Sequence, residues 1–415
     1  MAVTNLAKQI ETLLPMQLVE FMESAGLVAG KLGWRLYLVG GTVRDLLLKR
    51  PNYDIDLVVE GDAVVLGKRL AEAKNAKITV HPRFGTVKLQ WQGWPIDIAT
   101  ARTETYAAPG ALPDPKPASL AEDLIRRDFT VNAMAVELFS GRWGQVIDLY
   151  GGQKDAKQKL IRILHDNSFV DDATRIWRAV RYEQRLDFTV EPATLRLLKR
   201  DIDYLDTISG DRIRRELELV FQESVPEQML RRAGGLGLLS RINKNLKGDE
   251  LRVDGFLAAR EYYYPEQPPL PVYLGTLTYP LTTKQIADIV SFLRLPKTES
   301  AIVSDVAGLK SKTTRLQKPG LKRSAIYHLL DSYAPEAVEV NLFCSDSRQV
   351  TKYLSLFLNK LRYVKAETTG RELLKLGIPA GPWVKEILER LSDARLDGKV
   401  RSKKGEQELA RHWLV

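Results

Sequence analysis

The sequence predicts an α+β protein, with an α/β head at the N-terminus followed by a chain that is helical over most of its length. Short apolar runs of strand length crowd residues 35–100 and alternate with a helical pattern. Beyond Tyr150 the strand-like runs fade and helical periodicity takes over. At 415 residues, 44% hydrophobic and 27% charged, the chain has the composition of a globular protein with about two to four domains.

The head is predicted to begin with a helix over residues 5–33. A further helix is expected at Ala63–Lys74, and strands are expected at Trp34–Val39, Ile55–Val59, Lys77–Val80, Thr86–Trp91 and Pro95–Ala99. Residues 102–118 contain four prolines and one glycine, which predicts a loop without regular structure. A loop of that length in a compact domain is usually functional or mobile.

After the head, helices are expected at residues 171–185, 192–198 and 211–222. Proline-rich residues 264–271 and Lys318-Pro319-Gly320 predict breaks between helical parts. These signals divide the chain into four parts, which are a head over 1–147 and helical parts over 148–225, 226–320 and 321–415.

The charge of the chain is positive and unevenly spread. The net charge is +10, and residues 301–415 carry 21 Lys and Arg against 13 Asp and Glu. A basic surface of this kind favours a polyanion such as RNA, and a solvated helical surface is an equal alternative. The single cysteine, Cys344, excludes an internal disulfide and fits a reducing cytoplasm. No apolar run has the length of a membrane span, and the N-terminal residues form an amphipathic pattern unlike a signal peptide.

The strongest chemical signal lies in two short segments of the head. Gly40-Gly41 forms a turn from an apolar strand into a short helix that carries Arg44, and Asp54 and Asp56 begin the next strand. Residues two apart on a strand share a face, so the two carboxylates lie roughly 7 Å apart and suit Mg²⁺. The glycines leave backbone N–H groups open to phosphate oxygens, and Arg44 can neutralise a triphosphate.

Each of these features has an ordinary alternative. Asp-x-Asp pairs are common, and a Gly-Gly turn is usually only a turn. Their order, one short helix apart with an arginine between them, favours a site for a nucleoside triphosphate and its metal ions. Asp97, in the apolar strand 94–99, is a candidate third metal ligand, with a turn or salt-bridge role as the alternative.

A polar run at residues 122–133 offers further nucleotide ligands. Arg127 can reach a triphosphate or a ribose. Asp128 and Asn132 lie one helical turn apart and can hydrogen-bond a ribose hydroxyl. A helix cap with surface ion pairs is the alternative, and the segment taken alone favours it.

A second acidic and basic run, at residues 171–181, can select a base. On a helix Asp172 and Arg175 share a face, and Arg178 and Arg181 continue a basic stripe. Cytosine and adenine present an amine donor beside a ring-nitrogen acceptor, which match a carboxylate and a guanidinium. Uracil and guanine invert that pattern and leave polar groups unpaired, at about 1–3 kcal/mol each. An i,i+3 surface salt bridge is the alternative, and it is favoured by this segment alone.

Taken together, these residues resemble the motifs of class II tRNA nucleotidyltransferases, the CCA-adding enzymes, and of the related bacterial poly(A) polymerases. Five motifs occur in the family's order, and they are Gly40-Gly41-x-x-Arg44-Asp45 through Asp54-x-Asp56, Arg126–Ala133, Asp148–Asp155, Asp171–Arg175 and Asp211–Leu217. Asp171 replaces the family's usual Glu, and Trp177 stands where a smaller apolar residue is common. The base-selecting Asp172 and Arg175 are kept.

The resemblance implies a nucleotidyltransferase head followed by a helical neck, body and tail, in a seahorse-like shape that grips the tRNA acceptor arm at its 3′ end. It also implies that the loop at 102–118 helps to position the terminal A. The implied reaction is attack by the RNA 3′-hydroxyl on the α-phosphate of CTP or ATP, with Asp54 and Asp56 as catalytic residues that hold two Mg²⁺.

In this scheme Gly40, Gly41, Arg44 and Arg127 bind the triphosphate and ribose, and Asp172 and Arg175 select the base. Arg178 and Arg181 support that pair or touch phosphate. The product stays open between full CCA addition, A addition beside a separate CC-adding enzyme, and poly(A) synthesis. A non-catalytic tRNA-binding protein is an alternative of another class, and the intact carboxylate pair speaks against it.

Overall fold

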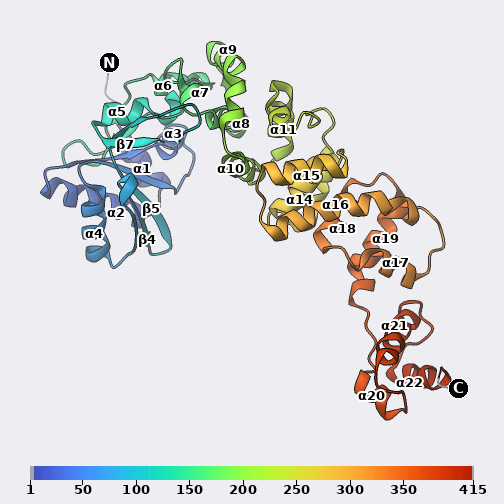
Figure 1. The fold of residues 1–415 in the computed structure, drawn as a ribbon. Helices are drawn as coiled ribbons and strands as arrows, with labels where there is room; N and C mark the ends of the chain where they lie inside the picture. The colour runs from blue at the N-terminus through green and yellow to red at the C-terminus, as the bar shows by residue number, and fades with distance from the viewer. Residues whose placement is uncertain (1–3, 112, 414–415) are drawn as a thin grey trace. The chain divides into compact units, whose positions relative to one another are not determined.

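The computed structural model describes residues 4–111 and 113–413, and Leu112, within the predicted loop, lies outside them. In the described head, seven strands form one mixed sheet (Figure 1). Across the sheet they are β3 (Lys77–His81), β4 (Thr86–Trp91), β5 (Trp94–Thr100), β2 (Ile55–Glu60), β1 (Arg35–Val39), β8 (Ala135–Glu137) and β9 (Val146–Ile147). β2 and β5 run parallel, and the other neighbours run antiparallel. The predicted α+β class is confirmed, and each strand predicted between residues 34 and 99 is present.

One face of the sheet carries the main hydrophobic core. The helices packed there are α1 (Ala7–Leu13), α2 (Met16–Lys31) and α4 (Ala63–Lys74). Alternate strand residues such as Leu57 and Ile98 are buried in this core. The single helix predicted over residues 5–33 is wrong, because Pro15 follows a residue in extended conformation and separates α1 from α2.

The opposite face of the sheet carries a smaller core and the candidate site. This core is formed by Tyr37, Val39, Val58, Ala101, Leu120, Leu124, Ala133 and Ala135. Leu120 and Leu124 belong to α5 (Leu120–Ile125). Because side chains alternate along a strand, Asp56 shares this face with Val58. The helix α5 therefore lies on the same side of the sheet as the predicted metal ligands.

Residues 102–118 are not the irregular loop that their prolines predicted. The strands β6 (Arg102–Thr105) and β7 (Asp114–Pro117) pair antiparallel in a hairpin. Pro115 and Pro117 lie two residues apart, so both ring nitrogens point to the same side of β7. In a two-stranded sheet one side of each strand is an open edge, where a missing N–H costs no ladder hydrogen bond.

The remaining elements lie between the strands of the head and along the chain up to Phe221. They are η1 (Pro82–Phe84), α3 (Gly41–Leu47), η2 (Thr130–Asn132), α6 (Gly152–Gln158), β10 (Leu160–Ile161), α7 (Ser168–Asp171), α8 (Thr174–Leu186), β11 (Thr189–Val190), α9 (Pro192–Asp201), η3 (Ile202–Thr207) and α10 (Gly210–Phe221). The short strands β10 and β11 pair in parallel within a region that the sequence predicted as helical. The helix predicted from Asp171 begins only at Thr174, because Asp172 is extended.

The contacts divide the chain into two compact units. The first extends to Glu216 and includes Leu236–Arg241, and the second comprises Leu217–Gly235 and the residues from Ile242 onward. The predicted boundaries at residues 147, 225 and 320 differ from this division, and they stay predictions.

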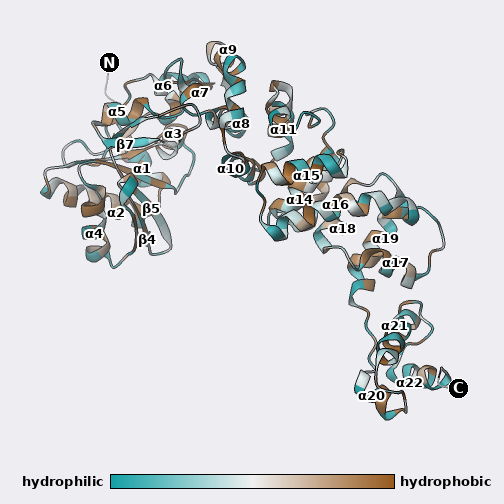
Figure 2. Ribbon diagram, in the orientation of Figure 1, coloured by the Kyte–Doolittle hydropathy of each residue, from teal (hydrophilic) through white to brown (hydrophobic). Residues whose placement is uncertain are grey.

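Beyond Glu216 the described chain is helical. Its elements are α11 (Pro226–Leu236), α12 (Leu238–Ile242), α13 (Val253–Tyr263), α14 (Leu270–Thr278), α15 (Thr283–Phe292), α16 (Lys297–Leu316), α17 (Arg323–Leu330), α18 (Pro335–Cys344), α19 (Arg348–Asn359), η4 (Leu361–Tyr363), α20 (Gly370–Lys375), α21 (Pro382–Leu396) and α22 (Lys403–His412). The break predicted at 264–271 covers the connection from α13 to α14 and the first two residues of α14, and the break at 318–320 falls between α16 and α17. Hydrophobic and hydrophilic residues are mixed along these helices (Figure 2), and among the described residues no helix is long and apolar enough to cross a membrane.

Candidate active site

Asp54 and Asp56 lie where the chain returns from α3 to the sheet. Asp54 is exposed and comes just before β2, and Asp56 is the second residue of that strand. Thr42 of α3 donates its hydroxyl to the Asp54 carbonyl, and the Asn52 side chain accepts from the Asp54 N–H. The carboxylate pair is therefore tied to the helix that follows the Gly-Gly turn.

The surroundings of Asp56 favour a bound cation. Burial, followed by the charge of Asp54, raises the pKa of Asp56 to about 6. The positive charge of Arg127 opposes part of this rise. Two carboxylates that repel each other in a half-buried place are a suitable donor set for a hard divalent ion such as Mg²⁺.

Asp97 faces the same cavity as Asp56. It is the register partner of Asp56 on the parallel strand β5, and its Oδ2 lies 3.2 Å from the Lys88 ammonium. Asp56, Asp97, Lys88 and Arg127 all line a cavity of about 260 Å³. Within the described residues, no group of three or more His, Cys, Asp or Glu could by itself hold a metal ion. The role of Asp97 as a third ligand stays a prediction.

Arg127 reaches this cavity from the end of α5. Its Nε and Nη2 donate to the Asp123 carboxylate at 3.2 and 2.8 Å. A Cβ built on Gly40 would stand 3.5 Å from Arg127 Nη1 and 3.4 Å from Asp56 Oδ2. Gly40 also has φ +76°, a conformation that favours glycine. The structure thus brings together Gly40, Asp56 and Arg127, as the triphosphate prediction requires.

Arg44 is buried and is held by protein groups. Its guanidinium donates to both carboxylate oxygens of Asp45 at 2.9 Å and to Asn132 Oδ1 at 2.6 Å. Asn132 in turn donates to Asp128 Oδ1 at 3.0 Å. These bonds join α3 to the turn η2. Direct contact of Arg44 with a triphosphate stays a prediction.

Asp128 is the centre of this buried network. Arg178 of α8 donates to Asp128 Oδ2 through Nε at 2.9 Å and Nη2 at 2.5 Å. Burial alone would raise the pKa of Asp128, but the charge of Arg178 and the hydrogen bond from Asn132 outweigh it and lower the pKa. Arg178 and Arg181 lie 5.5 and 5.1 Å from the centre of the Tyr182 ring. Arg178 and Arg181, which form the predicted basic stripe, therefore contact other groups of the first unit.

Asp172 lies between α7 and α8, so the prediction that it sits on a helix is wrong. Its Oδ1 accepts from the Thr174 N–H at 3.0 Å and from the Thr174 hydroxyl at 2.7 Å, and these bonds compete with a continuous helix. Arg175, in the first turn of α8, donates to Ser168 Oγ and to the Arg126 carbonyl, both at 2.6 Å. Within the described residues no ion pair joins Asp172 to Arg175, so the alternative of a salt bridge between them is wrong.

Known proteins match this chain over most of its length. Residues 36–162 match the poly A polymerase head domain, and residues 187–249 match the probable RNA and SrmB-binding site of polymerase A. The A-adding tRNA nucleotidyltransferase of Halalkalibacterium halodurans is 30% identical over 419 residues, which cover 95% of this chain and 92% of that protein. This chain belongs to the tRNA nucleotidyltransferase family.

Other members of this enzyme family are similar over the whole chain. The A-adding tRNA nucleotidyltransferase of Geobacter sulfurreducens is 35% identical over 414 residues, which cover 96% of this chain. The chain spans about half the length of that relative (47%). The structure of the Thermotoga maritima CCA-adding enzyme complexed with tRNA has a TM-score of 0.79 and 28% identity, with 100% of both chains covered.

Asp123 was not among the site residues predicted from the sequence. Its fully buried carboxylate pairs with both Arg126 and Arg127, at 2.5 and 2.8 Å. Burial would raise the pKa of Asp123, but the charges of Arg127 and Arg126 lower it. An acidic residue three and four positions before two arginines is the pattern of side-chain ion pairs along one helix. This pattern could have identified Asp123.

Two other missed residues come from segments distant in the sequence. Arg212 of α10 donates to Asp172 Oδ1 at 2.8 Å. Tyr106, just after β6, donates to Glu104 at 3.0 Å and lies close enough to Asp172 and Arg175 for their charges to act on its phenol. Burial, followed by the Glu104 charge, raises the pKa of Tyr106. No local pattern predicts the Arg212–Asp172 bond or the nearness of Tyr106 to Asp172 and Arg175, because both depend on the fold.

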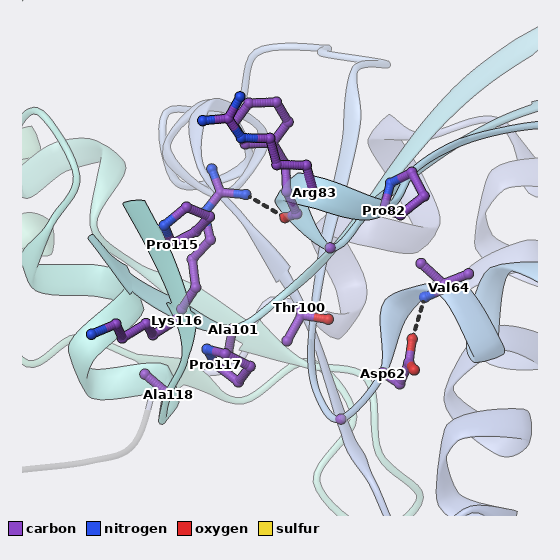
Figure 3. Close-up of a pocket in the computed structure, with 14 residues that line it drawn as sticks. Asp62, Val64, Pro82, Arg83, Thr100, Ala101, Pro115, Lys116, Pro117 and Ala118 are labelled. Atoms are coloured by element: carbon purple, nitrogen blue, oxygen red, sulfur yellow. Dashed lines mark hydrogen bonds between the residues drawn. The ribbon is translucent and has the colours of Figure 1, made fainter. Parts of the chain in front are cut away.

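The head of this family member also contains a larger cavity, of about 620 Å³ (Figure 3). It is lined by the start of α4, by η1 and by the β7 strand of the hairpin. Of its lining residues, Arg102 donates to the Phe84 carbonyl at 2.9 Å, and Asp62 accepts from the Val64 N–H at 2.8 Å. No residue predicted to bind nucleotide or metal lines this cavity. The candidate site is therefore assigned from its chemistry and not from cavity size.

Proposed function

We propose that this chain transfers nucleotides from ATP and CTP to the 3′ end of tRNA without a nucleic-acid template. The observation that carries the proposal is the Asp54 and Asp56 pair, with Gly40 and Arg127 beside it. Carboxylates suit the metal ions, the glycine leaves room for phosphate, and a guanidinium offsets phosphate charge. The family of the chain and the tRNA in the similar Thermotoga maritima structure support tRNA as the acceptor.

In the proposed reaction the RNA 3′-hydroxyl attacks the α-phosphate, a phosphodiester bond forms, and pyrophosphate leaves. Asp54 and Asp56 would hold Mg²⁺, with Asp97 as a further candidate. When bound, the ions supply activation of the hydroxyl and stabilisation of the leaving oxygen. Arg127, held by Asp123, orients the triphosphate.

The base is selected by Asp172 and Arg175. Asp172 accepts from the exocyclic amine of adenine or cytosine, and Arg175 donates to the ring nitrogen beside it. Contacts to Ser168 and to the Arg126 carbonyl hold Arg175 in place for this role. Arg44, Asp128, Asn132, Arg178 and Arg181 form the buried frame behind the site, and Asp128 and Asn132 remain the candidates for the ribose hydroxyls.

Addition of the terminal A is the reaction that the relatives favour. The proteins of Geobacter sulfurreducens and Halalkalibacterium halodurans are both A-adding enzymes. Full CCA addition is the second candidate, because the same base-selecting pair accepts both C and A. Within the proposal, the basic residues between 301 and 415 contact the tRNA, and the reaction takes place in the cytoplasm, where a single buried cysteine stays reduced.

The product can be determined with three tRNA transcripts, ending just before the CCA sequence, after its first C and after its second C. Each is incubated with Mg²⁺ and one nucleoside triphosphate at a time. An A-adding enzyme extends only the transcript that ends in C-C, and only with ATP. Extension of all three transcripts indicates full CCA addition, and a long A tail on unstructured RNA indicates poly(A) synthesis. No extension under any condition would overturn the proposed function.

A further inference from the structure

The two oxygens of the Asp172 carboxylate have different surroundings. Oδ1 accepts three hydrogen bonds, from the Thr174 N–H at 3.0 Å, the Thr174 hydroxyl at 2.7 Å and Arg212 Nη2 at 2.8 Å. Oδ2 accepts none within the described residues. Because the bonds to Oδ1 come from both α8 and α10, they restrict rotation of the carboxylate about its Cβ–Cγ bond. Oδ2 is thereby left in a defined place for a ligand.

Arg212 links two parts of the first unit to this carboxylate. Besides its bond to Asp172, it donates through Nη1 to the Gly110 carbonyl at 3.4 Å, in the loop of the β6–β7 hairpin. The side chains of Arg212 and Asp172 are 26% and 22% exposed. A pair with that access to water contributes little to stability. Because its guanidinium donates to two acceptors at once, Arg212 restricts the orientation of the Asp172 carboxylate.

We propose that Arg212 is a specificity-determining positioning residue for base selection, which holds Asp172 so that Oδ2 accepts from the amine of adenine or cytosine. This inference rests on the proposed function, in which Asp172 reads the base. Arg212 touches neither the base nor the reacting phosphate. Without Arg212, the Thr174 bonds remain, but the carboxylate can turn and accept from the ring N–H of guanine or uracil in place of the amine.

The test measures nucleotide discrimination in the full chain. For Arg212→Ala and Arg212→Lys, kcat/KM is determined for ATP and for GTP on a tRNA transcript ending in C-C. The ratio of the two values is expected to fall about tenfold or more in both variants, because a mispositioned charged acceptor no longer penalises the wrong base. The Lys variant keeps the charge but loses the planar fork that reaches two acceptors.

Two controls separate this role from a structural one. Arg215→Ala changes an exposed arginine on the same helix, and its ratio should equal that of the unchanged protein. A purely structural role of Arg212 would lower kcat/KM for ATP and GTP equally and leave their ratio unchanged. Since Lys replaces Arg at a partly exposed position, the Lys variant provides the ratio even if the Ala variant does not fold.

Asp172→Ala distinguishes failure of this inference from failure of the proposed function. If Asp172→Ala loses discrimination and the Arg212 variants keep it within twofold, the role of Arg212 is overturned and the base-selecting role of Asp172 stands. If Asp172→Ala itself keeps the ratio, the base-selecting assignment fails and the inference with it. The double variant with Asp172→Ala and Arg212→Ala should discriminate between ATP and GTP no worse than Asp172→Ala alone, because both changes remove the same interaction.

Discussion

The carboxylate site and the base-selecting site of the first unit are built in different ways. Asp54 and Asp56 owe their common face to strand alternation, which acts between neighbours in the sequence. Besides nearby contacts to Thr174 and Ser168, Asp172 and Arg175 bind partners 40 and 49 residues away, in α10 and just after α5. A site on a sheet can therefore be predicted from a short motif, whereas a site between helices depends on how the helices pack.

The largest effect is expected from Asp56→Ala, which removes a predicted metal ligand from the sheet. Loss of charge stabilisation at the phosphate should lower the rate of transfer on the order of 10³-fold or more. The measurement is single-turnover addition of A to a tRNA transcript ending in C-C. Binding of tRNA should be unchanged, and Asp331→Ala, at an exposed aspartate of the second unit, should keep full activity. A variant that retains a tenth of the rate would show that Asp56 is not a metal ligand.

Asp128→Asn should test how far the frame behind the base-selecting site depends on its buried ion pair. The change leaves Arg178, whose side chain is 32% exposed, without its charged partner, which should cost about 1–3 kcal/mol of unfolding free energy at pH 7. Urea unfolding measures the difference. The pKa of Asp128 is lowered in the folded state, so its contribution is present above the unfolded pKa and is lost as the pH falls through the folded pKa.

The control for this buried pair is Asp187→Asn. Asp187 pairs with Lys159 at 2.7 Å, but both side chains lie at the surface, where they are 87% and 59% exposed. Surface pairs contribute little because water and salt screen them. Equal free energies of unfolding for the two variants would mean that the Asp128 network stabilises the fold no more than a surface ion pair does.

The pH dependence of cation binding and of folding stability should distinguish Asp56 in the carboxylate site from the buried Asp128. Since the pKa of Asp56 is raised to about 6, the carboxyl must lose a proton before it can bind a cation near or below that pH. Affinity for Mn²⁺ should therefore fall up to about tenfold per pH unit below about 6. For folding the sign is opposite to that of Asp128, because ionisation of Asp56 costs stability as the pH rises from its unfolded pKa to about 6. Mn²⁺ affinity that stays constant between pH 5 and 7 would contradict the assignment.

The smallest effect is expected from Gly110→Ala in the hairpin loop. Gly110 has φ +78°, and a Cβ there would stand 2.5 Å from the Thr207 carbonyl oxygen of η3. Gly141→Ala is a matched control, because Gly141 has φ +89° but nothing within 4 Å of the added Cβ. Thermal unfolding should show Gly110→Ala less stable than Gly141→Ala by about 1 kcal/mol or more. Equal stability of the two variants would mean that the loop does not rest against η3.

Much of the head was predictable because its signals are local. The strands at residues 55–59 and 86–91 and the helix at Ala63–Lys74 follow from periodicity and were predicted within one residue of their observed ends. The hairpin at 102–118 was not predicted, because prolines usually interrupt strands and only pairing shows that their nitrogens can lie on an open edge.

The candidate site was predictable in its residues but only partly in its contacts. The sequence indicated Arg44, Asp128 and Arg178 as ligands of the nucleotide, whereas the structure shows them paired with one another or with Asp45 and Asn132. Whether an arginine faces a ligand or a carboxylate depends on burial, and burial depends on segments far apart in the chain.

By itself, the sequence determined the α+β class, the turn at Gly40-Gly41 and the common face of Asp54 and Asp56, because backbone propensity and strand alternation act over a few residues. Only the tertiary structure decided that Asp172 binds Arg212, and that the Asp123–Arg127 pair lies beside Asp56. Those contacts require packing between segments that are far apart in the sequence. Charged side chains form defined pairs only where that packing removes them from water.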